Sequence, residues 1–242
     1  QYELSFAQER LWFIESYESG SNAYNIPFVA KINASTNIDI LIKSIKSVVS
    51  RHEVLHSLIK TDSSGDGYQE VSDLTIMPIS INQIQVANAE ELSNYINQEV
   101  NHIFSLDREY PIRVSIISEI NEVSEESEYH SNKISKKASK ESTKATKASK
   151  LDVTKITAKV VTKRLDKATG QNTETINYLS IIIHHIAFDG WSIDVFLRDL
   201  QSYYSYYQEE ESGNKRAELK LPELTIQYKD FSVWQRSYLT GE

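Results

Sequence analysis

The chain has 242 residues, 40% of them hydrophobic and 25% charged, which is ordinary for a globular protein with a sizeable core. It contains no cysteine, which excludes disulfides and thiolate metal ligands. No run approaches the roughly 18–20 apolar residues of a membrane span, and no basic-then-apolar leader opens the chain. We therefore expect a cytoplasmic protein that does not act at a membrane.

The net charge of −8 is unevenly distributed. Of the 26 basic and 34 acidic residues, 12 and 3 lie between Lys133 and Lys167, so the remainder holds 14 and 31 and carries −17. So acidic a remainder argues against a nucleic-acid partner. The basic stretch could contact nucleic acid or an acidic neighbour, but its composition favours a solvated insertion.

Hydrophobic periodicity predicts alternating helices and strands in the first half of the chain. The expected elements are a helix at Phe6–Tyr17, a strand at Ala23–Ile32, a helix from Asp39 to about His56, a strand at Tyr68–Val71, a helix at Glu90–Phe104 and a strand at Ile112–Ile117.

From Asn121 to about Leu151 the chain is almost entirely Ser, Lys, Glu, Thr and Ala, with little to bury. Such a composition cannot offset the entropy of ordering, so we expect a disordered or weakly helical insertion in a surface connection. The segments 155–165 and 174–186 flank a turn-like stretch and predict a β-hairpin.

An amphipathic helix is predicted at Ser192–Gln208, with Ser192 as its N-cap and Asp194 in its first turn. An aromatic-rich segment, Leu224–Gln235, follows. Strands and helices alternate irregularly, so the fold class is α/β or α+β.

The stretch "HHIAFDGWS" (His184–Ser192) follows a strand that is apolar on both faces, which is typical of a central strand. Side chains alternate along a strand, so His184 and His185 should point in opposite directions. They cannot then ligate one metal ion together, and we expect no metal site.

The rest of this stretch admits two interpretations. Asp189 could orient an imidazole or pair with an arginine, Gly190 permits a special backbone conformation or a close approach, and Ser192 begins a helix. A histidine that takes a proton beside oriented amides suits acyl transfer. Alternatively, both histidines are hydrogen-bonded core residues and Asp189 caps a turn.

Four ordered motifs resemble the condensation domains of non-ribosomal peptide synthetases. The histidine stretch matches the family's HHxxxDG signature; the others are "LSFAQERLWFIESYESGSNAYNIP" (Leu4–Pro27), "RHEVLHSLI" (Arg51–Ile59) and "YKDFSVWQ" (Tyr228–Gln235). In the second motif His56 and Ser57 replace the usual Arg-Thr, which we interpret as a tolerated surface change. The Lys/Ser-rich insertion departs from the family pattern.

The resemblance implies a chloramphenicol acetyltransferase-like fold, a two-layer sandwich lobe with a mixed sheet packed against helices. The chain ends soon after the fourth motif, so residues 1–242 are expected to be the N-terminal lobe, with the insertion at about 121–151. A C-terminal lobe would complete the substrate tunnel, and the isolated half should be inactive.

The resemblance also implies roles for individual residues. His185 would act as general base or position the attacking amine, His184 would be structural, and Asp189 would pair with Arg51 to fix the loop. Gly190 would leave room for the thioester, and Trp191 and Ser192 would line the tunnel. The "DGWS" string resembles the subtype that condenses an L-configured donor.

The implied reaction joins two carrier-bound amino acids through an amide. No cofactor is expected to bind directly, because donor and acceptor peptidyl-carrier proteins deliver phosphopantetheine arms; an adjacent adenylation domain would be a further partner. Two alternatives stay open: a stand-alone coenzyme A-dependent acyltransferase of the same superfamily, and a non-catalytic remnant that docks carrier proteins.

Overall fold

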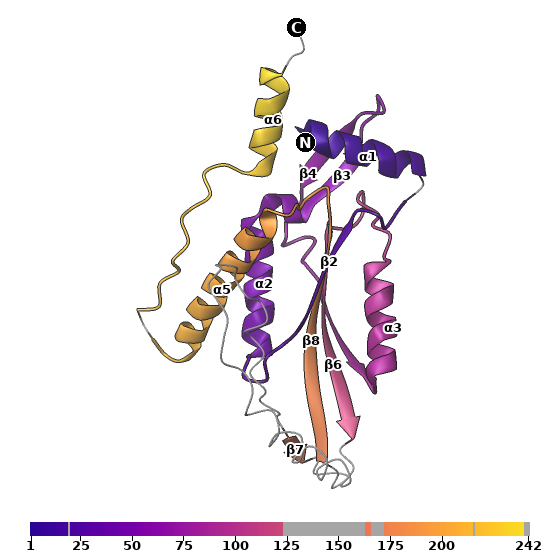
Figure 1. Cartoon of the computed structure of the whole chain (residues 1–242). Coiled ribbons are helices and arrows are strands. Elements are labelled where there is room, and N and C mark those ends of the chain that lie inside the picture. Colours follow the sequence, from indigo (N-terminus) through magenta and orange to yellow (C-terminus); the bar gives the residue numbers. More distant parts are fainter. Residues whose placement is uncertain (19, 123–162, 166–171, 215, 240–242) are drawn as a thin grey trace, which may run out of the picture.

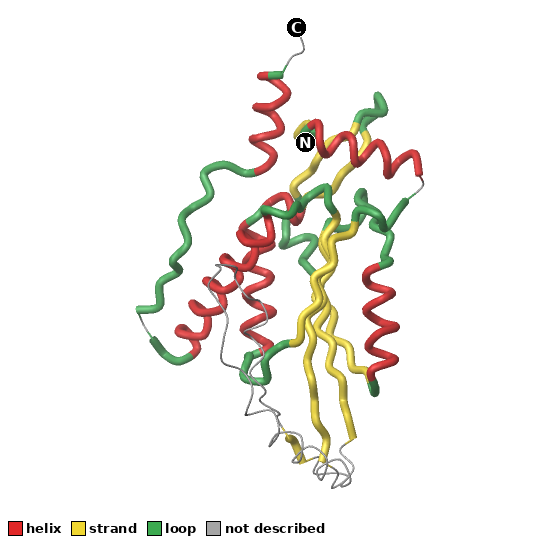
Figure 2. Tube along the Cα trace, in the orientation of Figure 1, coloured by secondary structure: helices red, strands yellow, loops and turns green. Residues whose placement is uncertain are grey.

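The computed structural model describes residues 1–18, 20–122, 163–165, 172–214 and 216–239. Its frame is a five-stranded sheet (Figures 1 and 2). The strand order is β2 (Asn25–Lys31), β8 (Asn172–His184), β6 (Ile112–Glu122) and β5 (Ile81–Val86), with β7 (Lys163–Leu165) also paired with β8. β8 runs antiparallel to β2 and β6, whereas β5 and β6 are parallel. The sheet is therefore mixed.

Helices cover both faces of this sheet. In Figure 1, α2 (Ile38–Arg51) and α5 (Ser192–Glu211) lie on one side and α3 (Ala89–Val100) on the other. The largest hydrophobic cluster joins α2 and α5 to the sheet, and a smaller cluster joins α3 to the opposite face. This layering confirms a mixed α/β architecture.

β8 is apolar on both faces because both faces are covered. Leu179, Ile181 and Ile183 lie in the cluster with α2 and α5, while Ile182 belongs to a separate cluster with Leu4. Fully burying such a side chain contributes roughly 1.5–3 kcal/mol. The strand is thus fixed in depth and register, which fixes where its last residue points.

A second sheet of three antiparallel strands lies near the carboxyl end of β8. Its order is β1 (Tyr2–Glu3), β4 (Gly67–Val71), β3 (Ser57–Thr61). α1 (Phe6–Glu18) and α6 (Tyr228–Tyr238) lie beside it (Figure 1). Arg236 Nε donates to the Leu4 carbonyl oxygen at 2.7 Å, which ties α6 to the start of the chain.

Several element boundaries differ from the prediction. The helix expected to reach His56 ends at Arg51, and a 3₁₀ helix, η1 (Glu53–His56), follows. The helix expected to reach Phe104 ends at Val100. The strands β1, β3 and β5 were not predicted; they have only two, five and six residues, and they depend on partner strands that local pattern does not reveal.

The replacement of Arg-Thr by His56 and Ser57 is not a surface change, and that interpretation was wrong. His56 and Ser57 are 6% and 2% exposed, because η1 leads directly into β3 of the second sheet. The Nδ1–H of His56 donates to the Ser72 carbonyl oxygen at 3.0 Å, and the Ser57 hydroxyl donates to the Glu53 carbonyl oxygen at 2.7 Å. Both replacements are therefore core residues.

The first two residues of the predicted insertion, 121 and 122, belong to β6, which extends through Glu122; its residues 123–151 lie outside the described residues. The predicted hairpin is confirmed for β7, where Leu165 lies opposite Asn172. Its residues 155–162 lie outside the described part of the chain.

Deleting residues 123–151 should leave the melting temperature of the chain nearly unchanged. Glu122 lies opposite Thr173 and Lys163 opposite Glu174, so β8 holds both ends of the connection. Loop-closure entropy changes slowly with loop length. We expect a shift below about 4 °C, which corresponds to about 1 kcal/mol in a chain of this size. A larger fall, not reversed by a Gly/Ser replacement of equal length, would show that the segment contributes to the core.

Candidate active site

The two adjacent histidines differ sharply in burial. His184 is the last residue of β8 and is 1% exposed, whereas His185 begins the following turn and is exposed. Backbone hydrogen bonds fix the chain at both residues. The His184 N–H donates to the Pro111 carbonyl oxygen at 2.9 Å and the His185 N–H to that of Tyr24 at 2.8 Å.

His184 is a hydrogen-bonded core residue. Its Nδ1 accepts from the Ile186 N–H at 3.1 Å, so its Nε2–H donates to Oε1 of Glu15 on α1, at 3.2 Å. Burial lowers the pKa of His184 despite the opposing effect of Glu15, which keeps the ring neutral near physiological pH. Its contacts tie β8 to α1 and leave it unavailable for chemistry.

His184→Ala should lower the free energy of unfolding by about 1–3 kcal/mol, because the Ile186 N–H and the Glu15 carboxylate lose their partner. The loss should depend on pH. With a folded pKa below the ordinary 6.5, the folded state binds fewer protons, so stability from the neutral ring is present above 6.5 and is lost as the pH falls below it. Urea unfolding at several pH values should show this decline in the wild type and a flatter profile in the variant. Equal profiles would contradict the assignment.

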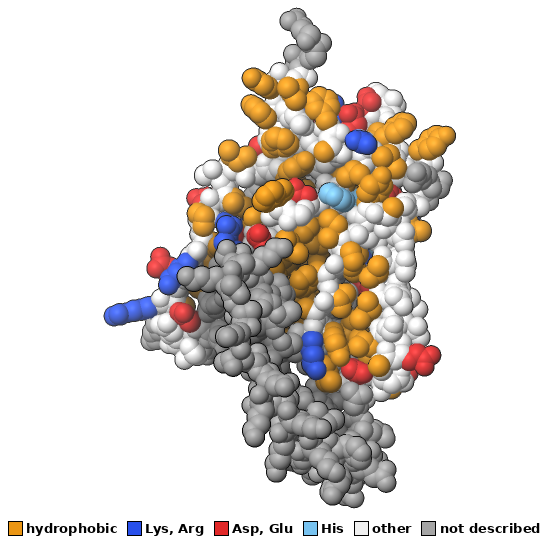
Figure 3. Space-filling view, in the orientation of Figure 1, with side chains coloured by type: hydrophobic (Ala, Val, Ile, Leu, Met, Phe, Trp, Pro, Cys, Tyr) orange, Lys and Arg blue, Asp and Glu red, His pale blue; other side chains and the backbone are white. Residues whose placement is uncertain are grey.

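His185 lines an open cleft of about 700 Å³, called here the histidine cleft. The cleft lies between α1, the turn after β8 and the segment that leads into α6. Its walls are Ala7, Arg10, Leu11, Ile14, Tyr24, His52, Val54, His185, Ile186, Ala187, Phe188, Asp189, Ser192, Leu224, Ile226, Gln227 and Tyr228. In Figure 3, hydrophobic side chains (orange) gather along the middle of the face shown, and an exposed histidine (pale blue) lies among them. Among the described residues, the His185 ring has no hydrogen-bond partner, so it is free to meet a ligand.

Asp189 holds the loop between β8 and α5. Its Oδ1 accepts from the Trp191 N–H at 3.1 Å and from the N–H and hydroxyl of Ser192 at 2.9 and 2.6 Å. The hydroxyl bond and these amide bonds lower the pKa of Asp189, so the carboxylate stays ionised. Ser192 is the first residue of α5 and not its N-cap as predicted, because the carboxylate of Asp189 already occupies the first free amides.

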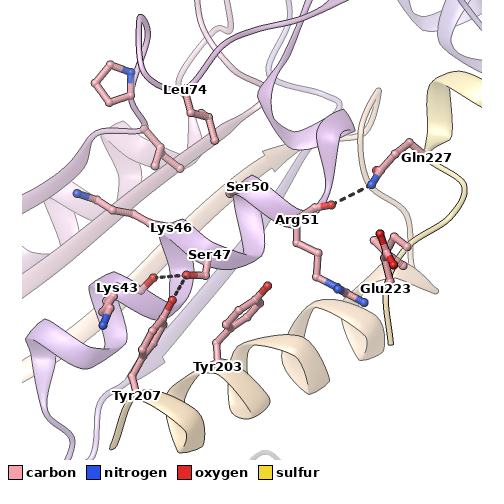
Figure 4. A pocket seen from close by; sticks show the side chains of 13 residues that line it. Lys43, Lys46, Ser47, Ser50, Arg51, Leu74, Tyr203, Tyr207, Glu223 and Gln227 are labelled. Atoms are coloured by element: carbon pink, nitrogen blue, oxygen red, sulfur yellow. Dashed lines mark hydrogen bonds between the residues drawn. The ribbon is translucent and has the colours of Figure 1, made fainter. Parts of the chain in front are cut away.

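Arg51 does not pair with Asp189, and that expectation was wrong. Its Nε donates to Oδ2 of Asp199 on α5 at 3.0 Å, and its guanidinium also donates to the Pro222 carbonyl oxygen. Figure 4 shows Arg51 extending from the last turn of α2 toward Glu223, along a separate pocket of about 650 Å³. The side chain follows α5 because α2 and α5 pack together, and Asp189 is already satisfied within its own loop.

Gly190 does not need the conformational freedom of glycine. The left-handed φ values occur at Gly20, Gly65 and Gly213, and a Cβ at Gly190 would meet no atom within 4 Å. Among the described residues, no atom lies close enough to Gly190 to require a glycine there. Trp191 is 86% exposed and is not part of the cleft wall, whereas Ser192 is.

Two candidate functional residues, His52 and Asp199, were not identified from the sequence. His52 lines the histidine cleft, and its Nε2 lies 2.9 Å from Oδ2 of Asp199, which is fully buried. Arg198 also donates to Asp199, at 3.0 and 3.1 Å. The sequence does contain a signal for Asp199: a carboxylate on the apolar stripe of α5, between the buried residues Phe196 and Leu200. Burial opposes ionisation of Asp199, but the bonds from His52 and Arg198 outweigh it and lower its pKa.

The described helices include none with the length and apolar character needed to cross a membrane. Within the described residues, no three His, Asp or Glu side chains are grouped as metal ligands would be. The histidine cleft itself presents an exposed imidazole, an ionised loop carboxylate and apolar walls.

Solved structures show the fold class. The chain is similar to the first condensation domain of the calcium-dependent antibiotic synthetase in complex with a substrate analogue, with a TM-score of 0.61, 14% identity and coverage of 99% of this chain and 44% of that one. It is also similar to a mutant starter condensation domain of rhizomide synthetase RzmA in complex with C8-CoA, with a TM-score of 0.61, 12% identity and coverage of 99% and 42%. The fold is chloramphenicol acetyltransferase-like, as predicted.

A family model described as the condensation domain matches residues 1–130 and 119–242, so the chain belongs to the condensation domain family. Among curated relatives, N-(5-amino-5-carboxypentanoyl)-L-cysteinyl-D-valine synthase of Amycolatopsis lactamdurans is 28% identical over 239 residues. That match covers 99% of this chain and 5% of the relative. The chain thus spans a small part of this relative and less than half of each of the two solved chains described above.

Proposed function

We propose that this chain is the N-terminal lobe of a condensation domain that forms amide bonds between carrier-bound amino acids in non-ribosomal peptide synthesis. The observation that supports the proposal most is His185, an exposed imidazole in an apolar cleft, at the end of the central strand and inside the region matched by the family model.

In the proposed reaction, the amine of the acceptor attacks the thioester carbonyl of the donor. The new C–N bond forms as the C–S bond breaks, and the proton leaving the amine ends on the released thiol. His185 takes that proton or accepts its hydrogen bond. Asp189 keeps the loop rigid through Ser192 and Trp191, so the cleft wall does not need to reorganise.

The partners follow from this reaction. Donor and acceptor carrier proteins would deliver their substrates on phosphopantetheine arms, the C-terminal lobe would close the tunnel, and an adenylation domain would supply the activated amino acids. We assign the L-donor subtype from the "DGWS" string, and space beside Gly190 suits the thioester.

A coenzyme A thioester is the second candidate donor. It is favoured by one observation, the similarity to a starter condensation domain of rhizomide synthetase in complex with C8-CoA. In that case the chain would move an acyl group to a small amine or alcohol without a donor carrier.

One experiment separates these candidates. The complete polypeptide that carries this chain is mixed with a loaded donor carrier and a loaded acceptor carrier, and both carriers are followed by intact-protein mass spectrometry. We expect the acceptor carrier to gain the mass of the donor aminoacyl group. Transfer from a coenzyme A thioester to a free amine, without carriers, would favour the acyltransferase. Binding of carriers without any transfer would indicate a docking remnant.

A further inference from the structure

The histidine cleft contains a second imidazole, that of His52. Unlike the ring of His185, it is hydrogen-bonded to a carboxylate of the described chain. His52 follows the last residue of α2 and lines the cleft together with His185. It also borders an adjoining hollow of about 120 Å³, which it shares with Phe188 and Ser192. Its side chain is 20% exposed, so it is held in place and still reachable.

The contact with Asp199 decides which nitrogen of His52 is available. Asp199 is fully buried and its lowered pKa keeps it ionised, so its Oδ2 can only accept. The Nε2 of His52, 2.9 Å away, must then donate. In the neutral ring the other nitrogen, Nδ1, carries the lone pair, and it has no hydrogen-bond partner among the described residues.

This arrangement is that of an oriented hydrogen-bond acceptor. A buried carboxylate that accepts a hydrogen bond from one ring nitrogen fixes the orientation and the tautomer of the ring. His185 lacks such a carboxylate partner in the described part of the chain. The cleft thus presents two imidazoles, one oriented by Asp199 and one without a hydrogen-bond partner among the described residues.

We propose that His52 is a further substrate-binding residue of the histidine cleft, whose Nδ1 accepts a hydrogen bond from the amine of the acceptor and so orients that amine for attack. The proposal rests on the proposed function, because it needs an amine substrate. It assigns the two imidazoles different tasks: His52 orients the nucleophile, and His185 meets the proton that the amine releases.

Two substitutions separate orientation of substrate from structural support. In His52→Gln the amide nitrogen replaces Nε2 and keeps the bond to Asp199, but the lone pair of Nδ1 is lost. In His52→Asn the amide lies near the place of Nδ1 and can still accept, but the bond to Asp199 is lost. A purely structural role predicts that activity follows stability, with Gln above Asn. Our proposal predicts the reverse order of activity.

The test is dipeptidyl-carrier formation in the complete polypeptide, with the concentration of the loaded acceptor carrier varied. We expect His52→Gln to keep its melting temperature and to lose about tenfold or more in kcat/KM for the acceptor, as loss of one substrate-orienting bond of about 1.4 kcal/mol predicts. His102→Gln is the matched control, since His102 also bonds a carboxylate, that of Glu109 at 3.0 Å, but lies outside the cleft wall.

Wild-type rates in a folded His52→Gln variant, or activity that ranks with stability, would overturn the proposal while leaving the proposed function intact. Absence of product with the wild type would instead overturn the proposed function, and this proposal with it. If His52→Gln does not fold, ¹⁵N NMR of the histidine rings decides: we expect His52 to be protonated at Nε2 and free at Nδ1, and the opposite tautomer would contradict us.

Discussion

Asp199→Ala is expected to lower the free energy of unfolding of the chain by about 3–5 kcal/mol, because it leaves the largely buried guanidinium of Arg51 without its counter-charge. The Arg51 side chain is 10% exposed and Asp199 is fully buried, so water cannot replace the lost bond. Arg51→Ala should cost less, because Asp199 keeps its bonds from His52 and Arg198. The double variant should lose much less than the sum, since the two residues act as one unit. Urea unfolding of the four proteins measures the coupling.

Two controls make this cycle specific. Arg198 also bonds Asp199 but is 61% exposed, so Arg198→Ala should cost no more than about 1 kcal/mol. Asp189→Ala should be additive with Arg51→Ala, because the two residues do not meet. If the measurements instead coupled Arg51 to Asp189 and not to Asp199, the pair predicted from the sequence would be right and the pair seen in the structure would be wrong.

The bonds that Asp199 receives from His52 and Arg198 also predict sensitivity to acid. The folded pKa of Asp199 lies below its ordinary 3.8, so the folded state binds fewer protons there than the unfolded state. Its stabilisation is therefore present above 3.8 and is lost as the pH falls through the folded pKa. Asp199→Asn should remove this part of the acid transition.

His185→Ala is expected to lower the rate of dipeptide formation by about 10²–10⁴ if the ring takes the proton of the amine, and by less if it only positions the amine. Little stability should be lost, since the ring is exposed and has no hydrogen-bond partner among the described residues. The measurement is a single-turnover assay in the complete polypeptide, with a melting curve for each protein. A folded variant with the wild-type rate would exclude His185 from the chemistry.

The placement of the two histidines could be predicted from sequence because it depends only on strand alternation and on burial of both faces. A run such as Leu179–Ile183 has one stable position in a covered sheet, and the residues that follow it must then diverge. The α2 and α5 helices were predictable for the same reason, as each has one continuous apolar stripe.

The partner of Arg51 could not be predicted, because it depends on how two helices far apart in sequence pack together. Asp199 is a buried carboxylate within the apolar stripe of α5, and its partners Arg51 and His52 come from a distant part of the sequence. His56 and Ser57 were misjudged similarly, since η1 and β3 carry them into a sheet of which only β4 was predicted from the sequence. The local sequence pattern shows which face of a helix or strand is buried, whereas the partner of a polar side chain depends on the tertiary structure.

The most direct test of the account is a side-by-side comparison of His184→Ala and His185→Ala, two identical changes at adjacent positions. Melting temperature and dipeptidyl-carrier formation are measured for both variants in the complete polypeptide. We predict that His184→Ala is destabilised yet retains turnover per folded molecule, and that His185→Ala stays folded and loses turnover. If His185→Ala unfolds the protein while a stable His184→Ala abolishes turnover, the assignment of the two faces is wrong.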